Sequence, residues 1–391
     1  MPAIVVTLAL ALSSPAHAQQ ELQRYALLVG DNDGGPSRVQ LRYAHDDAAE
    51  MASVLTELGG VRDDQQQLLL DPTAASLDAA FADLAAKLAD GAGARAEFVF
   101  YYSGHSDEQG LLLGDERYEY RALRARLEGM PARVRIAILD SCASGALILE
   151  KGGKPVEPFL VDESTQVGGL AYLTSSSADE AAQEAERIGG SFFTHYLASG
   201  LRGAADSSGD GRVTLYEAYS YAHQETLEHT ETTQNGPQHA WYSNRLSGTG
   251  ELVLTDLALT SASLVLDEAL DGRALIRDAD GNLVVELQKV AGRPIELGLA
   301  EGHYSVTLLS GPESYGEAQV ELTTGASTLV QANELVWQAS EVAVARGNLP
   351  PGAVPPVVMP PIAVVAPVEP PLDDNWFRFV VAPGMPAAAR P

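Results

Sequence analysis

Apolar positions between Arg24 and Asp256 follow two spacings, which predict two kinds of element. Short runs that are apolar on both faces, such as Phe98-Val99-Phe100, are typical of strands buried in a parallel sheet. Longer segments repeat an apolar residue every three or four positions, as between Leu77 and Leu88, which predicts a helix with one buried face. The predicted strands are 25–30, 67–71, 97–102, 134–139 and 170–174, and the predicted helices are 46–58, 73–90, 120–128, 191–201 and 215–227, with a hairpin at 111–120. Strands that alternate with helices predict an α/β fold, a mostly parallel sheet with helices on both faces.

The pattern changes near Asp256. From Leu257 to Val330, short runs alternate with period two and are separated by turn signals such as Asp280-Gly281, which predicts a small antiparallel β-sandwich. Nine of the twenty-three residues from Leu349 to Pro371 are proline, which favours an extended linker. The expected organisation is therefore a leader at 1–18, an α/β domain at 19–256, a β-sandwich at 257–335 and a proline-rich linker and tail at 336–391.

The leader is expected to be a signal peptide. Ile4 to Leu12 is apolar but too short to span a bilayer, and Ala16-His17-Ala18 before Gln19 is typical of a cleavage site. No Lys or Arg precedes the apolar run, which departs from the usual pattern. We expect an exported protein, periplasmic or secreted, with no membrane span.

The charge and the cysteine content limit the classes of partner and of cross-link that the chain can have. The chain has 25 basic and 53 acidic residues, a net charge of −28, which argues against nucleic-acid partners and is compatible with a basic polypeptide substrate. Its single cysteine, Cys142, cannot form an intramolecular disulfide.

Two motifs lie at the predicted carboxyl ends of neighbouring strands, where active sites of open α/β sheets form. One is Tyr101-Tyr102-Ser103-Gly104-His105 and the other is Asp140-Ser141-Cys142-Ala143-Ser144-Gly145. A thiol needs a base to become a nucleophile, and a histidine on the adjacent strand end supplies one. Taken singly, a cysteine after an apolar strand is often a small buried hydrophobe, and a histidine at a strand end is more often a hydrogen-bonded structural residue.

Together these motifs resemble those of the caspase-like cysteine peptidases, most closely the metacaspases and bacterial orthocaspases. The resemblance covers roughly Arg24 to Asp256 and implies a caspase–haemoglobinase fold with a Cys–His dyad. It implies that Cys142 is the nucleophile, that His105 is the general base and acid, and that the backbone N–H groups of Gly104 and Cys142 form the oxyanion hole. No cofactor is required for this chemistry.

The same resemblance implies an acidic specificity pocket. Asp47 and Asp140 match the aspartates that line it in metacaspases, although Asp46 stands where the family has Asn, and Ser103 is expected to line the same pocket. Such a pocket favours Arg or Lys before the scissile bond. The alternative for Asp47 is a favourable charge in the first turn of its helix.

The loop from Leu147 to Gly168 contains Lys151 and Lys154. If the pocket is acidic, cleavage after either lysine would make the protein self-processing. The alternative is a plain connecting loop.

A third feature is the segment from Asp206 to Glu217, which fits a twelve-residue EF-hand loop. Its candidate Ca²⁺ ligands are Asp206, Ser208, Asp210, the carbonyl of Arg212 and Glu217. The alternative is a glycine-rich turn in which Glu217 simply starts the next helix.

The sequence thus predicts an exported caspase-like cysteine endopeptidase that acts on proteins or peptides after Arg or Lys and is influenced by calcium. One alternative is a catalytically silent caspase-like binding or signalling module of the cell envelope. A second is a calcium-regulated adhesion or scaffold protein whose β-sandwich binds an unknown partner.

Overall fold

The computed structural model describes residues 22–91, 96–142, 144–147, 168–177, 180–248, 251–311 and 314–339. The expected signal peptide, Lys151, Lys154 and all but the first four residues of the expected linker and tail lie outside these residues. The chain divides into two compact units, 1–342 and 343–391, and all described residues belong to the first.

A six-stranded sheet forms the centre of the α/β region, in the order β11-β7-β6-β3-β1-β2. Its strands are β1 (Gln23–Asp31), β2 (Val61–Leu70), β3 (Ala96–Gly104), β6 (Val134–Asp140), β7 (Gly168–Thr174) and β11 (Trp241–Ser247). All neighbouring pairs are parallel except β11 with β7. The apolar pattern did not predict β11, because this edge strand has mostly exposed or half-buried side chains and no continuous apolar run.

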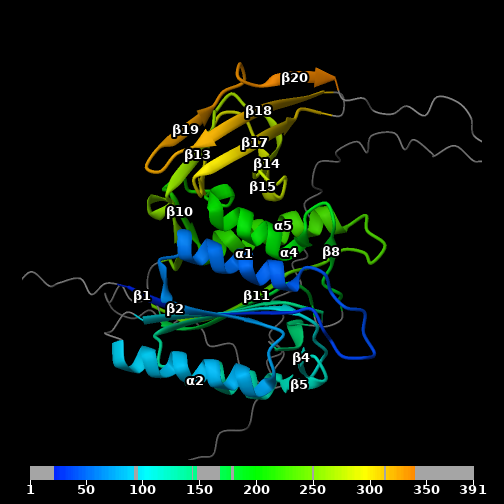
Figure 1. Cartoon of the computed structure of the whole chain (residues 1–391), viewed down its shortest axis with the longest axis vertical. Helices are drawn as coiled ribbons and strands as arrows, with labels where there is room; N and C mark the ends of the chain where they lie inside the picture. Colours follow the sequence, from blue (N-terminus) through cyan, green and yellow to red (C-terminus); the bar gives the residue numbers. More distant parts are fainter. Residues whose placement is uncertain are drawn as a thin grey trace, which may run out of the picture. The chain divides into compact units, whose positions relative to one another are not determined.

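Helices cover both faces of this sheet, as predicted. Helix α2 lies on one face, and α1, α4 and α5 lie on the other (Figure 1). The helices are α1 (Ala44–Glu57), α2 (Ala74–Gly91), α3 (Tyr120–Gly129), α4 (Phe192–Ser199) and α5 (Leu215–Thr230), with short helical turns η1 (Ser144–Leu147), η2 (Gly200–Ala204) and η3 (Leu257–Leu259). Short strand pairs complete the region: β4 (Gly110–Leu113) with β5 (Glu116–Glu119), β8 (Glu184–Ala185) with β9 (Gly190–Ser191), and β10 (Arg212–Thr214) with β12 (Val253–Asp256).

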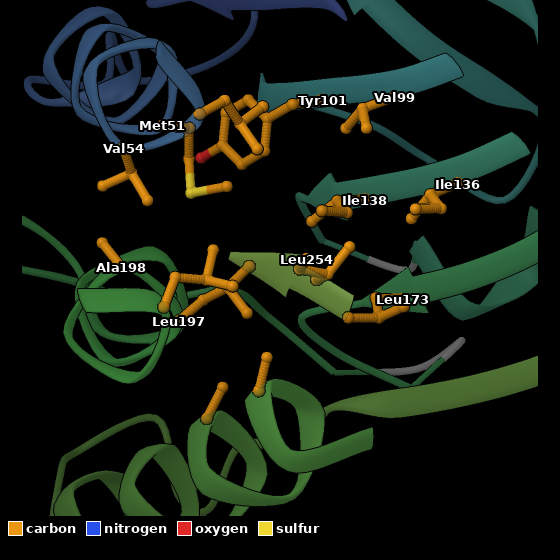
Figure 2. Close-up of a cluster of buried hydrophobic side chains, with 14 of the residues drawn as sticks. Met51, Val54, Val99, Tyr101, Ile136, Ile138, Leu173, Leu197, Ala198 and Leu254 are labelled. Atoms are coloured by element: carbon orange, nitrogen blue, oxygen red, sulfur yellow. The ribbon is translucent and has the colours of Figure 1, made fainter. Parts of the chain in front are cut away.

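Alternate residues of each central strand enter two separate cores. Leu28 of β1 and Tyr101 of β3 pack with Met51 and Leu197 in the core beneath α1 and α4 (Figure 2). The intervening side chains of each strand, such as Leu27 of β1, enter the other core, on the α2 face of the sheet. Both faces of the sheet are therefore buried by apolar contacts, which fixes the register of its strands.

The region after Asp256 is a β-sandwich with its own apolar core. A five-stranded antiparallel sheet has the order β15-β14-β17-β18-β20, and a three-stranded sheet has the order β16-β13-β19. The strands are β13 (Ala262–Leu266), β14 (Gly272–Arg277), β15 (Leu283–Lys289), β16 (Ile295–Leu299), β17 (Gly302–Leu309), β18 (Ser314–Leu322), β19 (Ser327–Val330) and β20 (Val336–Ala339). Two details differ from the predicted antiparallel domain: β13 pairs with β19 in parallel, and β20 extends the sandwich beyond residue 335.

Among the described residues, no helix has both the length and the apolar content needed to cross a bilayer.

Arg24 joins the first strand to the end of the α/β region. Its guanidinium lies 2.6 Å from Glu97 Oε2, with the arginine side chain 3% exposed. It also donates to the carbonyls of Gly59, Val253 and Leu254. One buried cation thus satisfies one carboxylate and three backbone carbonyls, which together come from three segments of the chain.

We expect Arg24→Met to lower the free energy of unfolding by about 3–5 kcal/mol, because it leaves the buried Glu97 carboxylate without its cation. The matched control is Arg62→Met. Arg62 pairs with Asp64 at an exposed site, where the pair contributes less than about 1 kcal/mol. Urea denaturation of both variants measures the difference, and equal losses would contradict this role for Arg24.

Candidate active site

The two predicted motifs meet at the carboxyl edge of the central sheet. In the parallel registers, Gly104 lies opposite Asp31, and Ser103 lies opposite Asp140. The ends of β1, β3 and β6 are therefore side by side, which is where α/β sheets place reactive groups.

His105 is held by backbone groups and by close packing. Its carbonyl accepts hydrogen bonds from Tyr102 OH at 2.6 Å and from Leu112 N at 2.9 Å. Its ring Nε2 lies 2.8 Å from the carbonyl oxygen of Val39. A carbonyl only accepts, so Nε2 carries a proton and Nδ1 of the neutral ring is left as the acceptor. Gly34 permits this placement, because a Cβ there would lie 2.3 Å from the His105 ring.

Cys142 is half-buried and has a free thiol. The Ser106 hydroxyl donates to its carbonyl oxygen, so the residue after His105 is tied directly to the candidate nucleophile. On the other side, Ser141 N donates to Ser175 Oγ at 3.1 Å, and Ser176 Oγ donates to Ser141 O at 3.0 Å. Burial raises the pKa of the Cys142 thiol above its ordinary value. The group is therefore a thiol near neutral pH, and a base would have to remove its proton before it could act as a nucleophile.

Asp47, Ser103 and Asp140 come together beside this centre. Ser103 Oγ donates to Asp47 Oδ2 at 2.9 Å. Ser191 joins the two carboxylates, because its N–H donates to Asp47 Oδ1 at 3.1 Å and its hydroxyl donates to Asp140 Oδ2. Thr194 Oγ1 donates to the same Asp140 oxygen at 2.6 Å. Asp47 lies in the first turn of α1, but its carboxylate accepts hydrogen bonds from Ser103 and Ser191 rather than from the N–H groups of that turn.

The two carboxyl groups are almost fully buried, with Asp47 4% exposed and Asp140 3% exposed. Burial, and then the nearby charge of Asp140, raise the pKa of Asp47 well above its usual range. Burial also raises the pKa of Asp140, against the hydrogen bonds from Ser191 and Thr194. Asp140 Oδ1 is buried and has no hydrogen-bond partner among the residues that the structure describes. Such an arrangement attracts a cation that can satisfy the remaining oxygen and the negative charge.

A further buried carboxyl group lies at the same sheet edge. Asp31 is 1% exposed, and its Oδ1 accepts from Asp33 N at 2.9 Å. Within the described part of the chain, its Oδ2 has no hydrogen-bond partner. Burial raises the pKa of Asp31 to about 7. Asp31 could not be predicted from the sequence, because no motif marks it apart from its position at the end of a strand.

The loop from Asp206 to Glu217 is closed by its own hydrogen bonds. Asp206 accepts from the backbone of Gly209 at 2.6 Å and Gly211 at 3.0 Å, and Asp210 accepts from Arg212 N at 2.9 Å. Glu217 forms a capping box with Thr214 at the start of α5, as the alternative interpretation expects. Across the described part of the chain, no three His, Cys, Asp or Glu side chains gather closely enough to hold a metal ion. Calcium binding, with Ser208 as a further ligand, stays a prediction.

Besides Asp31, three groups at the site could not be predicted from the sequence. Ser191 and Thr194 follow an N-cap pattern before an apolar helix, which predicts the cap but not the bonds to Asp140. The Val39 carbonyl has no sequence signal at all, because every residue type provides a carbonyl.

Comparisons with known proteins identify the family to which the chain belongs. The family model of the caspase domain matches residues 23–248, more than half of the 391-residue chain. The crystal structure of caspase-1 from Spodoptera frugiperda is 12% identical with a TM-score of 0.46, and the match covers 64% of this chain and 100% of that one. A crystal structure of a protein from Geobacter sulfurreducens is 17% identical with a TM-score of 0.40, and the match covers 58% of this chain and 94% of that one. No curated protein sequence matches the chain.

We expect Asp47→Asn to stabilise the protein at neutral pH. A raised pKa means that the native state prefers the neutral carboxyl, so ionisation removes stability as the pH rises through the native pKa. Asparagine is neutral at every pH, keeps an acceptor for Ser191 N and can donate to Ser103 Oγ. The melting temperature should rise by about 2 °C or more at pH 7.5, which corresponds to roughly 1 kcal/mol in a domain of this size.

The difference from wild type should shrink as the pH falls toward about 4, the ordinary pKa of the group, because Asp47 is then protonated in both states. The control is Asp46→Asn, which removes the neighbouring exposed carboxylate from the same helix turn. An Asp47→Asn variant that melts lower than wild type at both pH values would contradict the account.

Proposed function

Because the chain belongs to the caspase-domain family, we propose that it is a cysteine endopeptidase that cleaves polypeptides after arginine or lysine. The observation that carries the proposal is the buried pair Asp47 and Asp140, at the same sheet edge as Cys142 and His105. Family membership supports peptidase chemistry in general, and the carboxylate pair supports the basic residue before the scissile bond.

In the proposed reaction, the Cys142 thiol gives its proton to His105 Nδ1 as its sulfur attacks the scissile carbonyl carbon. The Val39 carbonyl stabilises the resulting imidazolium by accepting from Nε2. The backbone N–H groups of Gly104 and Cys142 are the proposed donors to the oxyanion that develops on the carbonyl oxygen. The backbone at this position has room only for glycine, because a Cβ at Gly104 would lie 2.5 Å from Tyr102 OH.

Collapse of this intermediate breaks the carbon–nitrogen bond. The amine leaves with the proton from His105, and Cys142 remains as a thioester. Water then attacks the thioester while His105 takes its proton, and the thiolate recovers that proton as the acid product leaves. These steps use only the atoms of the dyad, the substrate and one water molecule.

The basic side chain of the substrate is proposed to enter beside Asp140. Its cation would satisfy Asp140 Oδ1 and lower the pKa values of both carboxyl groups, so the pair ionises as the substrate binds. A guanidinium or ammonium group is favoured by this environment, whereas a substrate carboxylate is repelled. Self-processing after Lys151 or Lys154 is part of the same proposal, as is an exported location based on the leader at 1–18.

A second candidate is a catalytically silent binding module. It is favoured by the raised pKa of the Cys142 thiol, because a buried protonated thiol is a poor nucleophile unless a base activates it. The two candidates differ in whether turnover depends on Cys142.

We expect the protein from Gln19 onward to cleave fluorogenic peptides that end in Arg or Lys, and not peptides that end in Asp. Cys142→Ala should lower kcat/KM by more than about a thousandfold, because it removes the nucleophile. Ser144→Ala is a matched control near the nucleophile and should retain turnover. Cleavage after Asp alone would refute the acidic pocket, and absence of cleavage in the presence of reductant would favour the silent module.

Calcium dependence is a separate proposal with its own test. If the Asp206–Glu217 loop binds Ca²⁺, the ion should raise the melting temperature of the wild type, because a ligand that binds only the native state stabilises it. Glu217→Gln should remove this shift, since position 12 supplies two ligand oxygens. An identical calcium response in wild type and variant would exclude this loop as the site.

A further inference from the structure

Glu286 lies where the β-sandwich meets the helices of the α/β region. Glu286 is on β15 and is 2% exposed, and hydrogen-bond donors from several elements surround its carboxylate. Its carboxylate lies 2.6 Å from Nε of Arg273 on the neighbouring strand β14. It also lies 3.0 Å from Nη1 of Arg187, in the turn between β8 and β9. Burial raises the pKa of Glu286, but the two arginines outweigh this effect, so the pKa lies below its usual value.

Helix α4 is bound by the same residue. Tyr196 OH donates to Glu286 Oε2 at 3.4 Å, and Glu286 N donates to Ser199 Oγ at 3.3 Å. His195 Nε2 lies 3.8 Å from the same carboxylate oxygen. Glu286 therefore holds the buried face of α4 through both its side chain and its backbone.

Ser191 lies between these two attachments along the chain. Arg187 precedes Ser191 by four residues, and Tyr196 follows it by five residues. Ser191 is the residue that joins Asp47 to Asp140, and Thr194 in the same helix binds Asp140 as well. A shift of the Arg187 turn or of α4 would move both hydroxyl donors relative to the carboxylates.

The helix that carries Asp47 has a second connection to the sandwich. Arg202 forms ion pairs with Glu50 and Glu57 of α1. Its Nη1 donates to the carbonyl of Gly298 on β16 at 3.4 Å. Both helices that carry pocket residues thus contact the sandwich through buried arginine or glutamate side chains.

We propose that Glu286 is a positioning residue for the acidic pocket, and that the β-sandwich is a working part of substrate recognition rather than a separate attachment module. The inference rests on the proposed function, because it assigns the pocket to the basic substrate side chain. Glu286 acts through Arg187 and α4, which keep Ser191 and Thr194 on the two aspartates. Loss of Glu286 should therefore weaken substrate binding more than it changes the chemistry at Cys142.

The test compares wild type with Glu286→Gln and Arg187→Ala in the full chain. The KM for an arginine peptide should rise by on the order of tenfold or more in both variants, because small displacements of positioning groups have large effects. The alkylation rate of Cys142 by iodoacetamide should stay within about twofold of wild type, because that reaction does not use the pocket. Glu296→Gln is the matched control, since it removes an exposed carboxylate from β16, the next strand along the chain, and should leave KM unchanged.

A folded variant with wild-type KM would overturn the inference. If Glu286→Gln does not fold, Arg187→Ala decides, because its side chain is 48% exposed and its loss is better tolerated. If the wild type cleaves no peptide, the proposed function fails, and the dissociation constant of benzamidine, a pocket-sized cation, replaces KM. Weaker benzamidine binding in the variants than in wild type would still support positioning by Glu286. Equal binding, or no binding to the wild type, would overturn it.

Discussion

The site depends on the burial of two carboxyl groups next to each other. Asp47 comes from a helix and Asp140 from a strand end, and both are removed from water. Such burial is unfavourable unless donors surround the groups, and Ser103, Ser191 and Thr194 provide them. The end of β3 and the start of α4 are therefore held together by polar contacts to the acids. Even Gly190 conforms to this constraint, because a Cβ there would lie 2.8 Å from Asp47 Oδ1.

The rest of the molecule supplies the rigidity that this arrangement needs. Two apolar cores hold the sheet in place. Arg24 connects its first strand to the last segment of the α/β region. Glu286 of the sandwich accepts a hydrogen bond from α4. The donors remain in place because the elements that carry them are packed on several sides. Preorganised polar groups of this kind bind an incoming charge without first having to rearrange.

Much of this organisation could be predicted from local sequence. The central strands are long apolar runs, and the motifs at their ends predicted that His105, Cys142 and Asp140 lie at one edge of the sheet. Strand β11 was missed because an edge strand needs no apolar run, and the parallel pairing of β13 with β19 joins residues about sixty positions apart. Period-two alternation gives the buried face of a strand but not the direction of its partner. The role of Glu286 was equally hidden, because it depends on contacts between distant segments.

The contact between His105 and Val39 has a consequence for how this protein tolerates change. The orienting group is a main-chain oxygen, and the Val39 side chain is 85% exposed. Any residue at position 39 supplies the same oxygen, so the loop is free to vary in composition while the path of its backbone is constrained. Sequence divergence in this loop therefore says little about whether His105 keeps its orientation. A one-residue insertion or deletion between Asn32 and Ala44 would matter more than several substitutions there.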